Sequence, residues 1–241
     1  MSIYQDKKIT IFFGDAQHAI DRCLFDQNKS QAELEHVNSL LFIKQKLQLA
    51  SLFFTKQIHG AQGFLISHDV HEQPEADFLV TNKTQVGLGI YTADCLPIII
   101  YDPEHHAVAL AHAGWMGSVQ EIAIHALQAL EKAYGTKKQN VKVFFGPAAG
   151  PCCYVVQPSF REKLAPFNFS DQVLAVRDGH TYFDLVLFNK LQLSSYGVLA
   201  QAFNYHADCT IHTLSYCSYR RDNKNTARNV TLVALSLDFN C

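Results

Sequence analysis

Apolar and polar residues follow two different periods along this chain. Residues 30–50 carry apolar side chains at helical spacing, among them Leu34, Val37 and Leu41, which predicts an amphipathic helix. Further along, short apolar runs separated by polar turns predict the strands of a large sheet. These strands are expected at residues 63–66, 78–80, 86–91, 96–101, 107–111, 141–145, 210–214 and 231–235.

Two more helices are expected in the second half of the chain. Ser118 should begin one of them, because Ser-Val-Gln-Glu matches a capping box, and Gly135 should end it. The other is expected at residues 185–196. No repeat, low-complexity tract or linker divides the sequence, so we expect one domain over residues 1–241. The pattern predicts an α/β (α+β) protein with mixed sheets.

Composition and charge exclude several classes of function. The formal net charge is only −2 and the charged residues are interspersed, which argues against a nucleic-acid partner. The first twenty residues lack a signal-peptide pattern, and no run approaches the roughly 20 apolar residues of a membrane span. We therefore expect a cytoplasmic protein without a membrane partner. In that compartment its seven cysteines should be thiols, available for metal binding or catalysis.

A predicted hairpin brings a cysteine close to a histidine. Residues 102–106, Asp-Pro-Glu-His-His, should form a turn, so residues 98–101 and 107–110 should pair antiparallel. Extending both strands away from that turn places Cys95 opposite His112. A thiolate and an imidazole should therefore meet at the far end of the hairpin.

Cysteine and histidine are suitable ligands for zinc, and three protein ligands leave the fourth tetrahedral position open. Zinc lowers the pKa of a bound water to about 7, so such a site could catalyse hydrolysis. The helix expected to begin at Ser118 should point its N-terminus at the same edge and favour an anionic ligand. The second interpretation makes Cys95 a nucleophile with His112 as its base, and the third makes Cys95 a buried structural thiol.

Five segments of the chain match one known family in order and spacing. They are KQIHG at 56–60, TADCLP at 92–97, HAGWMG at 112–117, GPAAGPCCY at 146–154 and CSYRRD at 217–222. The chain thus resembles the YfiH family, also called laccase-domain or "polyphenol oxidase" proteins, along nearly its whole length. The resemblance implies His59 as a third metal ligand, catalytic together with Cys95 and His112. It also implies a layered sandwich of the CNF/YfiH-like cysteine hydrolase type.

The resemblance implies a zinc-dependent purine nucleoside enzyme. Members of the family are described as phosphorolysing adenosine, inosine and methylthioadenosine and as deaminating adenosine, which makes a nucleoside and phosphate the expected partners. A related bacterial member resembles a peptidoglycan editing amidase that acts on a UDP-muramoyl precursor, and this is the alternative function. A non-enzymatic metal-binding protein, with a fourth protein ligand, is the third possibility.

Two further motifs bear on the choice of metal and reaction. Copper is expected less than zinc, because multicopper centres typically use His-x-His pairs and this sequence has none. The zinc deaminase signature, H-x-E with a later P-C-x-x-C, is absent as well. Any deamination should therefore use a different scaffold.

Arginine and aromatic side chains near the motifs are the candidates for substrate binding. Arg220, Arg221 and Arg228 carry guanidinium groups that match phosphate oxygens, although solvated surface arginines are the alternative. Trp115 and Tyr219 could stack on a purine ring or pack beneath a loop.

The chain departs from the family pattern at three places. Met116 stands where the family usually has arginine, which removes a cation beside the expected metal. We therefore expect deamination to tolerate this change better than phosphorolysis. Thr226-Ala227-Arg228 replaces the common Thr-Gly-Arg, and Val155 replaces an acidic residue, so substrate preference should differ.

The remaining polar candidates have two interpretations each. Cys152 and Cys153 could line the pocket or serve packing, and neither is assigned as a ligand. Asp94 could orient a ligating imidazole or cap its turn. His68 and His71 could bind a metal weakly, although surface histidines are the commoner case.

Overall fold

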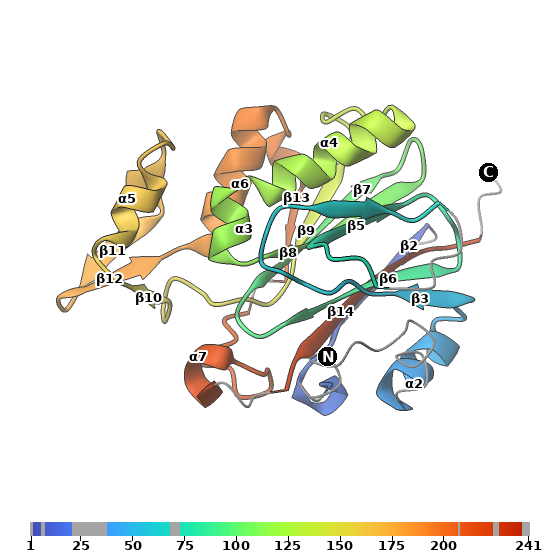
Figure 1. Ribbon diagram of the computed structural model, residues 1–241, viewed down its shortest axis with the longest axis horizontal. Coiled ribbons are helices and arrows are strands. Elements are labelled where there is room, and N and C mark those ends of the chain that lie inside the picture. The colour runs from blue at the N-terminus through green and yellow to red at the C-terminus, as the bar shows by residue number, and fades with distance from the viewer. Residues whose placement is uncertain are drawn as a thin grey trace.

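The protein is described by a computed structural model that covers residues 2–5, 8–20, 38–67, 73–206, 208–223 and 227–237. Two mixed sheets pack face to face, and helices cover both outer faces (Figure 1). Helices α4 (Ile122–Tyr134) and α6 (Leu185–Tyr196) cover one sheet, and α2 (Asn38–Lys46) covers the other. The prediction of a layered α+β sandwich with mixed sheets is confirmed.

The sheet beneath α4 and α6 has six strands in the order β13-β9-β7-β8-β5-β4. Its inner pairs are antiparallel, whereas the pairs at its two edges, β13 with β9 and β4 with β5, are parallel. The strands are β13 (Phe203–Tyr205), β9 (Lys142–Phe145), β7 (Leu96–Asp102), β8 (Ala107–Ala113), β5 (Phe78–Thr81) and β4 (Gly63–Leu65). Strands β7 and β8 are buried on both faces, so their sequences are continuously apolar rather than alternating.

The second sheet has five strands in the order β1-β2-β14-β6-β3. They are β1 (Ser2–Gln5), β2 (Ile9–Phe13), β14 (Asn229–Leu235), β6 (Val86–Thr92) and β3 (Ser51–Phe53). All pairs are antiparallel except β3 with β6. Strands from the two ends of the chain thus lie side by side in the middle of this sheet.

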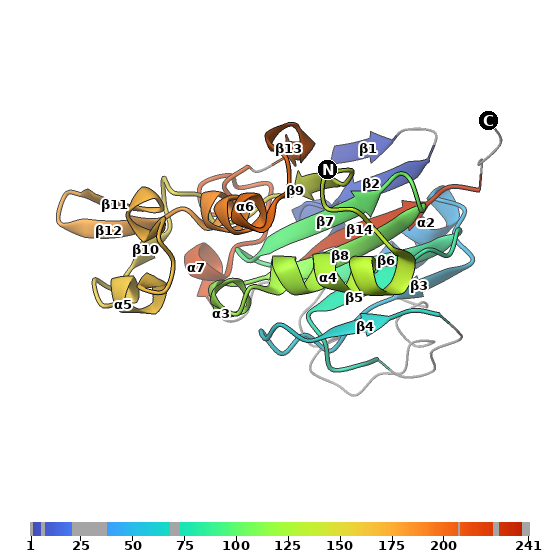
Figure 2. The same ribbon diagram turned by 90° about the horizontal axis from the view of Figure 1, so that it is seen from above.

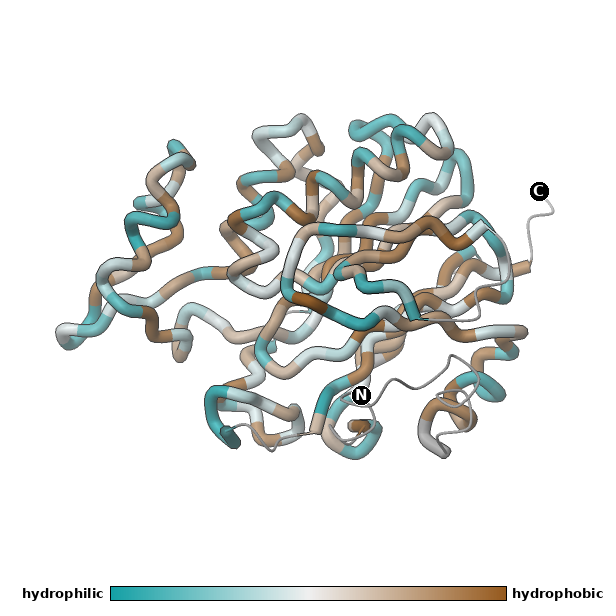
Figure 3. The backbone as a smooth tube through the Cα atoms, in the orientation of Figure 1, coloured by the Kyte–Doolittle hydropathy of each residue, from teal (hydrophilic) through white to brown (hydrophobic). Residues whose placement is uncertain are grey.

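Three clusters of buried apolar side chains separate the layers. One lies between the sheets, where Phe13 and Ile90 face Ile99 and Leu110. The other two lie beneath the helices on the outer faces. Figure 3 shows the same arrangement, with hydrophobic residues concentrated along the central strands and hydrophilic ones at the turns. Burial of these strands dominates the favourable free energy of folding.

A small lobe projects from one end of the sandwich (Figure 2). It contains α5 (Phe160–Leu164) and a three-stranded sheet of β10 (Val155–Val156), β12 (His180–Phe183) and β11 (Leu174–Arg177). The ring centroids of Phe160 and Phe183 are 4.9 Å apart, and those of Phe183 and Phe188 on α6 are 5.6 Å apart. The lobe therefore shares its apolar contacts with the helical layer.

Most of the expected elements are present, and two expectations are wrong. The strands expected in residues 63–111, 141–145 and 231–235 and the helix at 185–196 are confirmed within a few residues. The strand expected at 210–214 is a turn, in which the Thr213 N–H donates to the Cys209 carbonyl. The helix expected at 30–50 is described only from residue 38 onward.

The helix expected to begin at Ser118 is the second correction. Ser118 lies inside a short helix, α3 (Trp115–Val119), where its N–H donates to the Gly114 carbonyl and its Oγ accepts from Asn189. The long helix α4 starts after Glu121, which has a left-handed backbone and no capping side chain. The capping box is not formed, and Ser118 does not begin the long helix. In the described residues, no helix is long and apolar enough for a bilayer.

Candidate metal centre and catalytic site

The predicted hairpin forms between β7 and β8, with one correction to its register. Pro97, not Cys95, lies opposite His112, and Cys95 comes just before the first residue of β7. The thiol nevertheless reaches the imidazole and hydrogen-bonds with it. His112 is only 2% exposed, so one wall of the site is buried in the sheet.

The third expected ligand arrives from a different part of the chain. His59 lies in the loop between β3 and β4 and has a left-handed backbone with φ of 60°. Its ring centroid is 4.9 Å from that of His112, at an angle of 80°. One ligand atom each from His59, Cys95 and His112 lies within 4.8 Å of the others. The structure therefore brings together the three residues that the family resemblance implied.

A buried carboxylate, which the sequence reasoning missed, holds both histidines in place. Asp77 is fully buried immediately before β5, and its Oδ1 accepts a hydrogen bond from Nδ1 of His112 at 2.9 Å. The backbone N–H groups of Ile58, His59 and Gly60 donate to the same carboxylate at 3.3, 3.0 and 2.6 Å. Asp77 thus fixes the His112 tautomer and the His59 loop together, as residues behind a metal ligand do. An acidic residue just before an apolar strand was the one available signal.

Cys95 and His112 shift each other's pKa. Burial raises the pKa of the Cys95 thiol. The charge on His112 and hydrogen bonds from His112 and His59 lower it by more, so the resulting pKa is about 6. Burial lowers the pKa of His112, while the Cys95 thiolate and the Asp77 carboxylate raise it to about 9. Near neutral pH the metal-free site therefore holds a thiolate beside an imidazolium, and the thiolate is the form that binds a metal.

This donor set fits a zinc ion with an open coordination position. One thiolate and two imidazoles are common zinc ligands, and a carboxylate behind one imidazole is a usual companion. His59 is exposed while His112 is buried, so a zinc ion held by these residues would be reachable from solvent on the His59 side. A Cβ on Gly114 would lie 3.0 Å from the Cys95 sulfur, so glycine permits the close approach of the start of α3 to the thiol.

Asp94 does not orient an imidazole; it connects two loops. Its backbone is left-handed, with φ of 85°. Its Oδ1 accepts from the Thr210 hydroxyl at 2.7 Å, and its Oδ2 accepts from the Arg220 backbone N–H at 2.6 Å. The residue next to Cys95 therefore fixes the start of α7 (Tyr219–Asp222).

Arg220 and Arg221 differ in how many of their guanidinium N–H groups donate within the protein. All five N–H groups of the Arg221 guanidinium donate within the protein, to the Asp222 carboxylate and to the carbonyls of Thr210, Ile211 and Tyr216. Arg220 donates from one Nη to the Val155 carbonyl at 2.7 Å, and its other donors have no acceptor in the described part of the chain. Arg220 is therefore available for an anion, whereas Arg221 acts as a structural clamp.

Tyr154, a residue of the cysteine-containing turn, links Arg220 to the metal site. The Arg220 guanidinium lies 5.3 Å from the Tyr154 ring centroid. Burial raises the pKa of Tyr154, and the charges on Cys95 and Asp94 raise it further. The Tyr154 ring thus contacts the Arg220 guanidinium, and the charge on Cys95 acts on the Tyr154 hydroxyl.

The other expected binding residues lie around the same end of the sandwich. Arg228 immediately precedes β14, whose first residue, Asn229, pairs with Thr92 three residues before Cys95. Tyr219 is 43% exposed at the start of α7.

Trp115 packs edge-on against Phe160, with their ring centroids 5.5 Å apart, so the structure shows a packing role for Trp115. Met116 is exposed on α3. His68, His71 and Thr226 lie outside the described residues.

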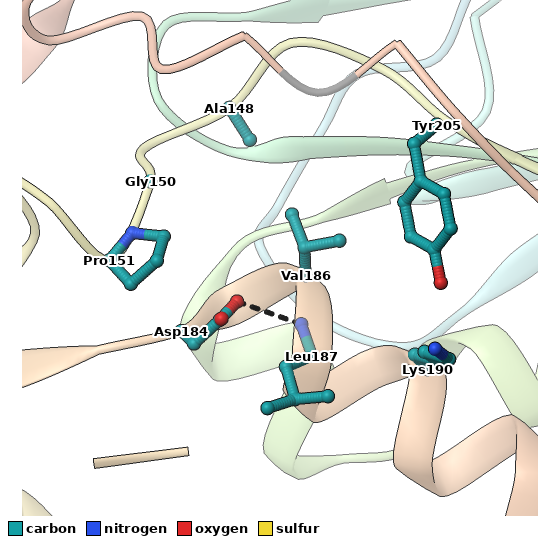
Figure 4. Close-up of a pocket in the computed structure, with 8 residues that line it drawn as sticks. All are labelled: Ala148, Gly150, Pro151, Asp184, Val186, Leu187, Lys190 and Tyr205. Atoms are coloured by element: carbon teal, nitrogen blue, oxygen red, sulfur yellow. Dashed lines mark hydrogen bonds between the residues drawn. The ribbon is translucent and has the colours of Figure 1, made fainter. Parts of the chain in front are cut away.

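A pocket of about 310 Å³ lies on the other side of the turn that contains Ala148, Gly150 and Pro151. Figure 4 shows these residues facing α6, where the Asp184 carboxylate accepts the Leu187 N–H at 2.8 Å. None of the three metal-ligand candidates lines this pocket. It is therefore separate from the metal site.

Comparison with known proteins agrees with this fold. Residues 25–236 match the family described as "Multi-copper polyphenol oxidoreductase laccase". The chain belongs to this family. The predicted resemblance to YfiH proteins is thereby confirmed, because a solved Bacillus licheniformis hypothetical protein YfiH superposes with a TM-score of 0.80. That match has 22% identity and covers 95% of this chain and 93% of the other.

Two similar relatives are named as nucleoside enzymes. A "Purine nucleoside phosphorylase" of Borreliella burgdorferi is 34% identical over 172 residues, covering 70% of this chain and 73% of that protein. "Purine nucleoside phosphorylase YlmD" of Geobacillus stearothermophilus is 32% identical over 179 residues, or 73% of this chain. The match spans 64% of the YlmD length. These names give no support to the amidase alternative.

Proposed function

We propose that this chain is a zinc-dependent purine nucleoside phosphorylase whose reaction takes place at His59, Cys95 and His112. The convergence of these three side chains in front of the buried Asp77 carboxylate is the observation that supports a catalytic metal site. The names of the relatives support the class of substrate. Zinc suits this mixed thiolate and imidazole set, and the absence of His-x-His pairs argues against a multicopper centre.

Each of the three proposed ligands has its own role in holding the metal. Cys95 supplies the thiolate, His112 supplies an imidazole whose orientation Asp77 fixes, and His59 closes the site from the solvent side. When bound, zinc would supply a Lewis acid next to the substrate. Because Nδ1 of His112 is engaged by Asp77, its Nε2 is the nitrogen available to the metal.

Phosphate binding is proposed for Arg220, with Arg228 as a second candidate. Met116 supplies no cation, and Arg221 has donated all its N–H groups within the protein. The Arg220 backbone N–H donates to Asp94, the residue before Cys95, and its guanidinium lies over the Tyr154 ring. Its remaining guanidinium donors match the oxygens of an anion. Of the three arginines expected from the sequence, Arg220 is therefore the principal candidate for phosphate.

In phosphorolysis a phosphate oxygen forms a bond to C1′ of the ribose while the bond from C1′ to N9 of the purine breaks. The purine leaves with the bonding electron pair and takes up a proton. Arg220 would hold the attacking phosphate, and Tyr219, exposed at the start of α7, is the proposed stacking partner for the base. Adenosine, inosine and methylthioadenosine share this bond, so all three are proposed substrates.

Deamination of adenosine is the second proposed reaction. Water adds at C6 of the purine and ammonia leaves, so neither phosphate nor a cation at position 116 is needed. The three-ligand set, with its open position, supports a reaction that uses water as well as one that uses phosphate.

Product analysis with and without phosphate tests both reactions. Zinc-loaded protein is incubated with inosine or adenosine, and the products are identified by mass spectrometry. We expect hypoxanthine and ribose 1-phosphate from inosine only when phosphate is present, and inosine from adenosine in either case. Chelator-stripped protein is the control. Folded, zinc-loaded protein that releases no purine base with phosphate present would refute phosphorolysis, and failure to form inosine would refute deamination.

A further inference from the structure

A second group of metal-binding side chains lies outside the site described above. Cys152 and Cys153 are in the turn between β9 and β10, and Cys209 and His212 are in the loop that follows β13. One ligand atom from each of the four lies within 4.8 Å of the others. The sequence reasoning treated the two adjacent cysteines as pocket-lining or packing residues, and it did not connect them with Cys209 or His212.

The separations between these atoms suit a tetrahedral zinc ion. The sulfurs of Cys152 and Cys153 lie 3.4 and 3.7 Å from Nδ1 of His212. Ligands around zinc at its usual bond lengths stand roughly 3.5 to 3.8 Å apart. These two sulfur-to-nitrogen separations are close to those that a bound zinc ion would impose, and all four ligand atoms lie within 4.8 Å of one another.

The backbone around Cys209 is arranged to support a thiolate. The N–H of Gly150 donates to the Cys209 sulfur at 3.3 Å, and the N–H groups of Ile211 and His212 hydrogen-bond with the same sulfur. A Cβ on Gly150 would lie 3.0 Å from Cβ of Cys209, so glycine permits this close approach. Three N–H donors directed at one sulfur stabilise negative charge on it, and the thiolate is the form that binds a metal.

Access and charge also favour a metal. Cys152 and His212 are exposed, so an ion reaches the group from solvent. Three thiolates and a neutral imidazole around zinc carry a net charge of about −1. The Arg177 guanidinium, which donates to the Pro151 carbonyl and interacts with Cys153, lies beside the group to balance that charge.

We propose that Cys152, Cys153, Cys209 and His212 bind a second zinc ion with four protein ligands and a structural role. It ties the turn after β9 to the loop after β13. Thr210, next to Cys209, donates to Asp94 beside the catalytic thiol, and its carbonyl accepts from Arg221. The second zinc would therefore hold in place Thr210, which contacts both Asp94, next to Cys95, and the Arg221 guanidinium.

Metal analysis of the full-length chain tests this proposal without an activity assay. Protein purified under reducing conditions and saturated with zinc is dialysed, and zinc per chain is measured by plasma mass spectrometry. We expect about two zinc ions in the natural sequence and about one in His212→Ala, Cys209→Ser and Cys95→Ser. His212 is exposed, so His212→Ala should fold even where Cys209→Ser does not.

Cobalt separates the two sites spectroscopically. Thiolate-to-cobalt absorption should fall by about three quarters in the Cys152→Ser, Cys153→Ser, Cys209→Ser triple variant and by about one quarter in Cys95→Ser, in proportion to the thiolates removed. One zinc per chain in the natural sequence, or an unchanged zinc count in His212→Ala, would overturn the proposal. A protein mass two units low before reduction, showing a disulfide in the group, would overturn it too.

Discussion

The two clusters of cysteine and histidine differ in what surrounds them. His59, Cys95 and His112 offer three donors, and the fully buried Asp77 carboxylate lies behind them. Cys152, Cys153, Cys209 and His212 offer four donors, and backbone N–H groups rather than a carboxylate contact the buried member, Cys209. Three ligands leave room for a substrate, whereas four close the coordination sphere. The number of donors and the groups behind them are therefore the basis on which we propose a catalytic role for the first cluster and a structural role for the second.

Removing one ligand from each cluster should have opposite main effects, and this is the largest difference expected. His59→Ala should lower phosphorolysis by at least about 100-fold, because the open site loses a ligand. Its effect on the melting temperature should be small, since His59 is exposed. Cys209→Ala should lower the melting temperature more than His59→Ala does, because it removes a buried ligand that joins two loops. Initial rates measure the loss of activity, and thermal unfolding measures the loss of stability. Equal melting temperatures for His59→Ala and Cys209→Ala would contradict the different roles of the two clusters.

The carboxylate behind the first cluster gives the next largest effect. Asp77→Asn should weaken zinc binding roughly 10- to 100-fold, because the amide cannot accept from His112 and from three backbone N–H groups as a carboxylate does. Competition with a chelator measures the affinity. Asp94→Asn is the matched control, since Asp94 contacts Thr210 and Arg220 but no ligand. Equal losses of zinc affinity in the two variants would contradict the assignment of Asp77.

Arg220 and Arg221 should have different roles near the proposed catalytic site. Arg220→Ala should raise KM for phosphate roughly tenfold, the loss of one charge-assisted hydrogen bond. Arg221→Ala should instead lower the melting temperature, because four acceptor groups lose their donor. Phosphate saturation curves and thermal unfolding of the two variants separate the roles. A larger rise in phosphate KM for Arg221→Ala than for Arg220→Ala would reverse them.

Protonation gives the smallest expected effect. In chelator-stripped protein, the Cys95 pKa of about 6 keeps the thiol ionised above that pH. The rate of Cys95 alkylation should therefore rise to half its maximum near pH 6, well below the ordinary pKa of 9.0. Asp77→Asn should move this midpoint to higher pH, because a less stable His112 imidazolium supports the thiolate less. Peptide mass spectrometry at several pH values follows the reaction; a midpoint near 9 would contradict the proposed ion pair.

The sign of the pH effect on stability follows from the same two shifts. A lowered Cys95 pKa stabilises the fold at high pH, and this contribution is lost as the pH falls from about 9 to about 6. A raised His112 pKa stabilises the fold at low pH, and this contribution is lost as the pH rises from 6.5 to about 9. The ion pair of Cys95 and His112 should therefore stabilise the metal-free protein most between about pH 6 and about pH 9.

Much of the fold follows from local sequence patterns. Long apolar runs bounded by turns predict β7 and β8, and the turn residues between them predict their hairpin. The strand expected at 210–214 is wrong because its backbone is used in turns around Cys209 and in bonds to Arg221. The capping box at Ser118 fails because Ser118 is buried inside α3 against Asn189. Tertiary contacts decided these two cases.

The site was predictable only in part for a similar reason. The hairpin brings Cys95 towards His112, and the family resemblance adds His59. Asp77 is 35 residues from its partner His112, and no periodicity relates the two. The second cluster joins residues about 60 positions apart, such as Cys152 and His212, and spacing within each segment gave no sign of that contact. Contacts between distant loops are set by the packing of the whole sandwich.

The most direct test of the central claim is a zinc titration of metal-stripped protein, followed by the phosphate-dependent release of hypoxanthine from inosine. The natural sequence is compared with a Cys95→Ser protein whose melting temperature matches that of the natural sequence. If the reaction takes place at His59, Cys95 and His112, zinc restores activity to the natural sequence and leaves Cys95→Ser near background at every zinc concentration. Restoration of Cys95→Ser to the activity of the natural sequence would show that the reaction takes place elsewhere.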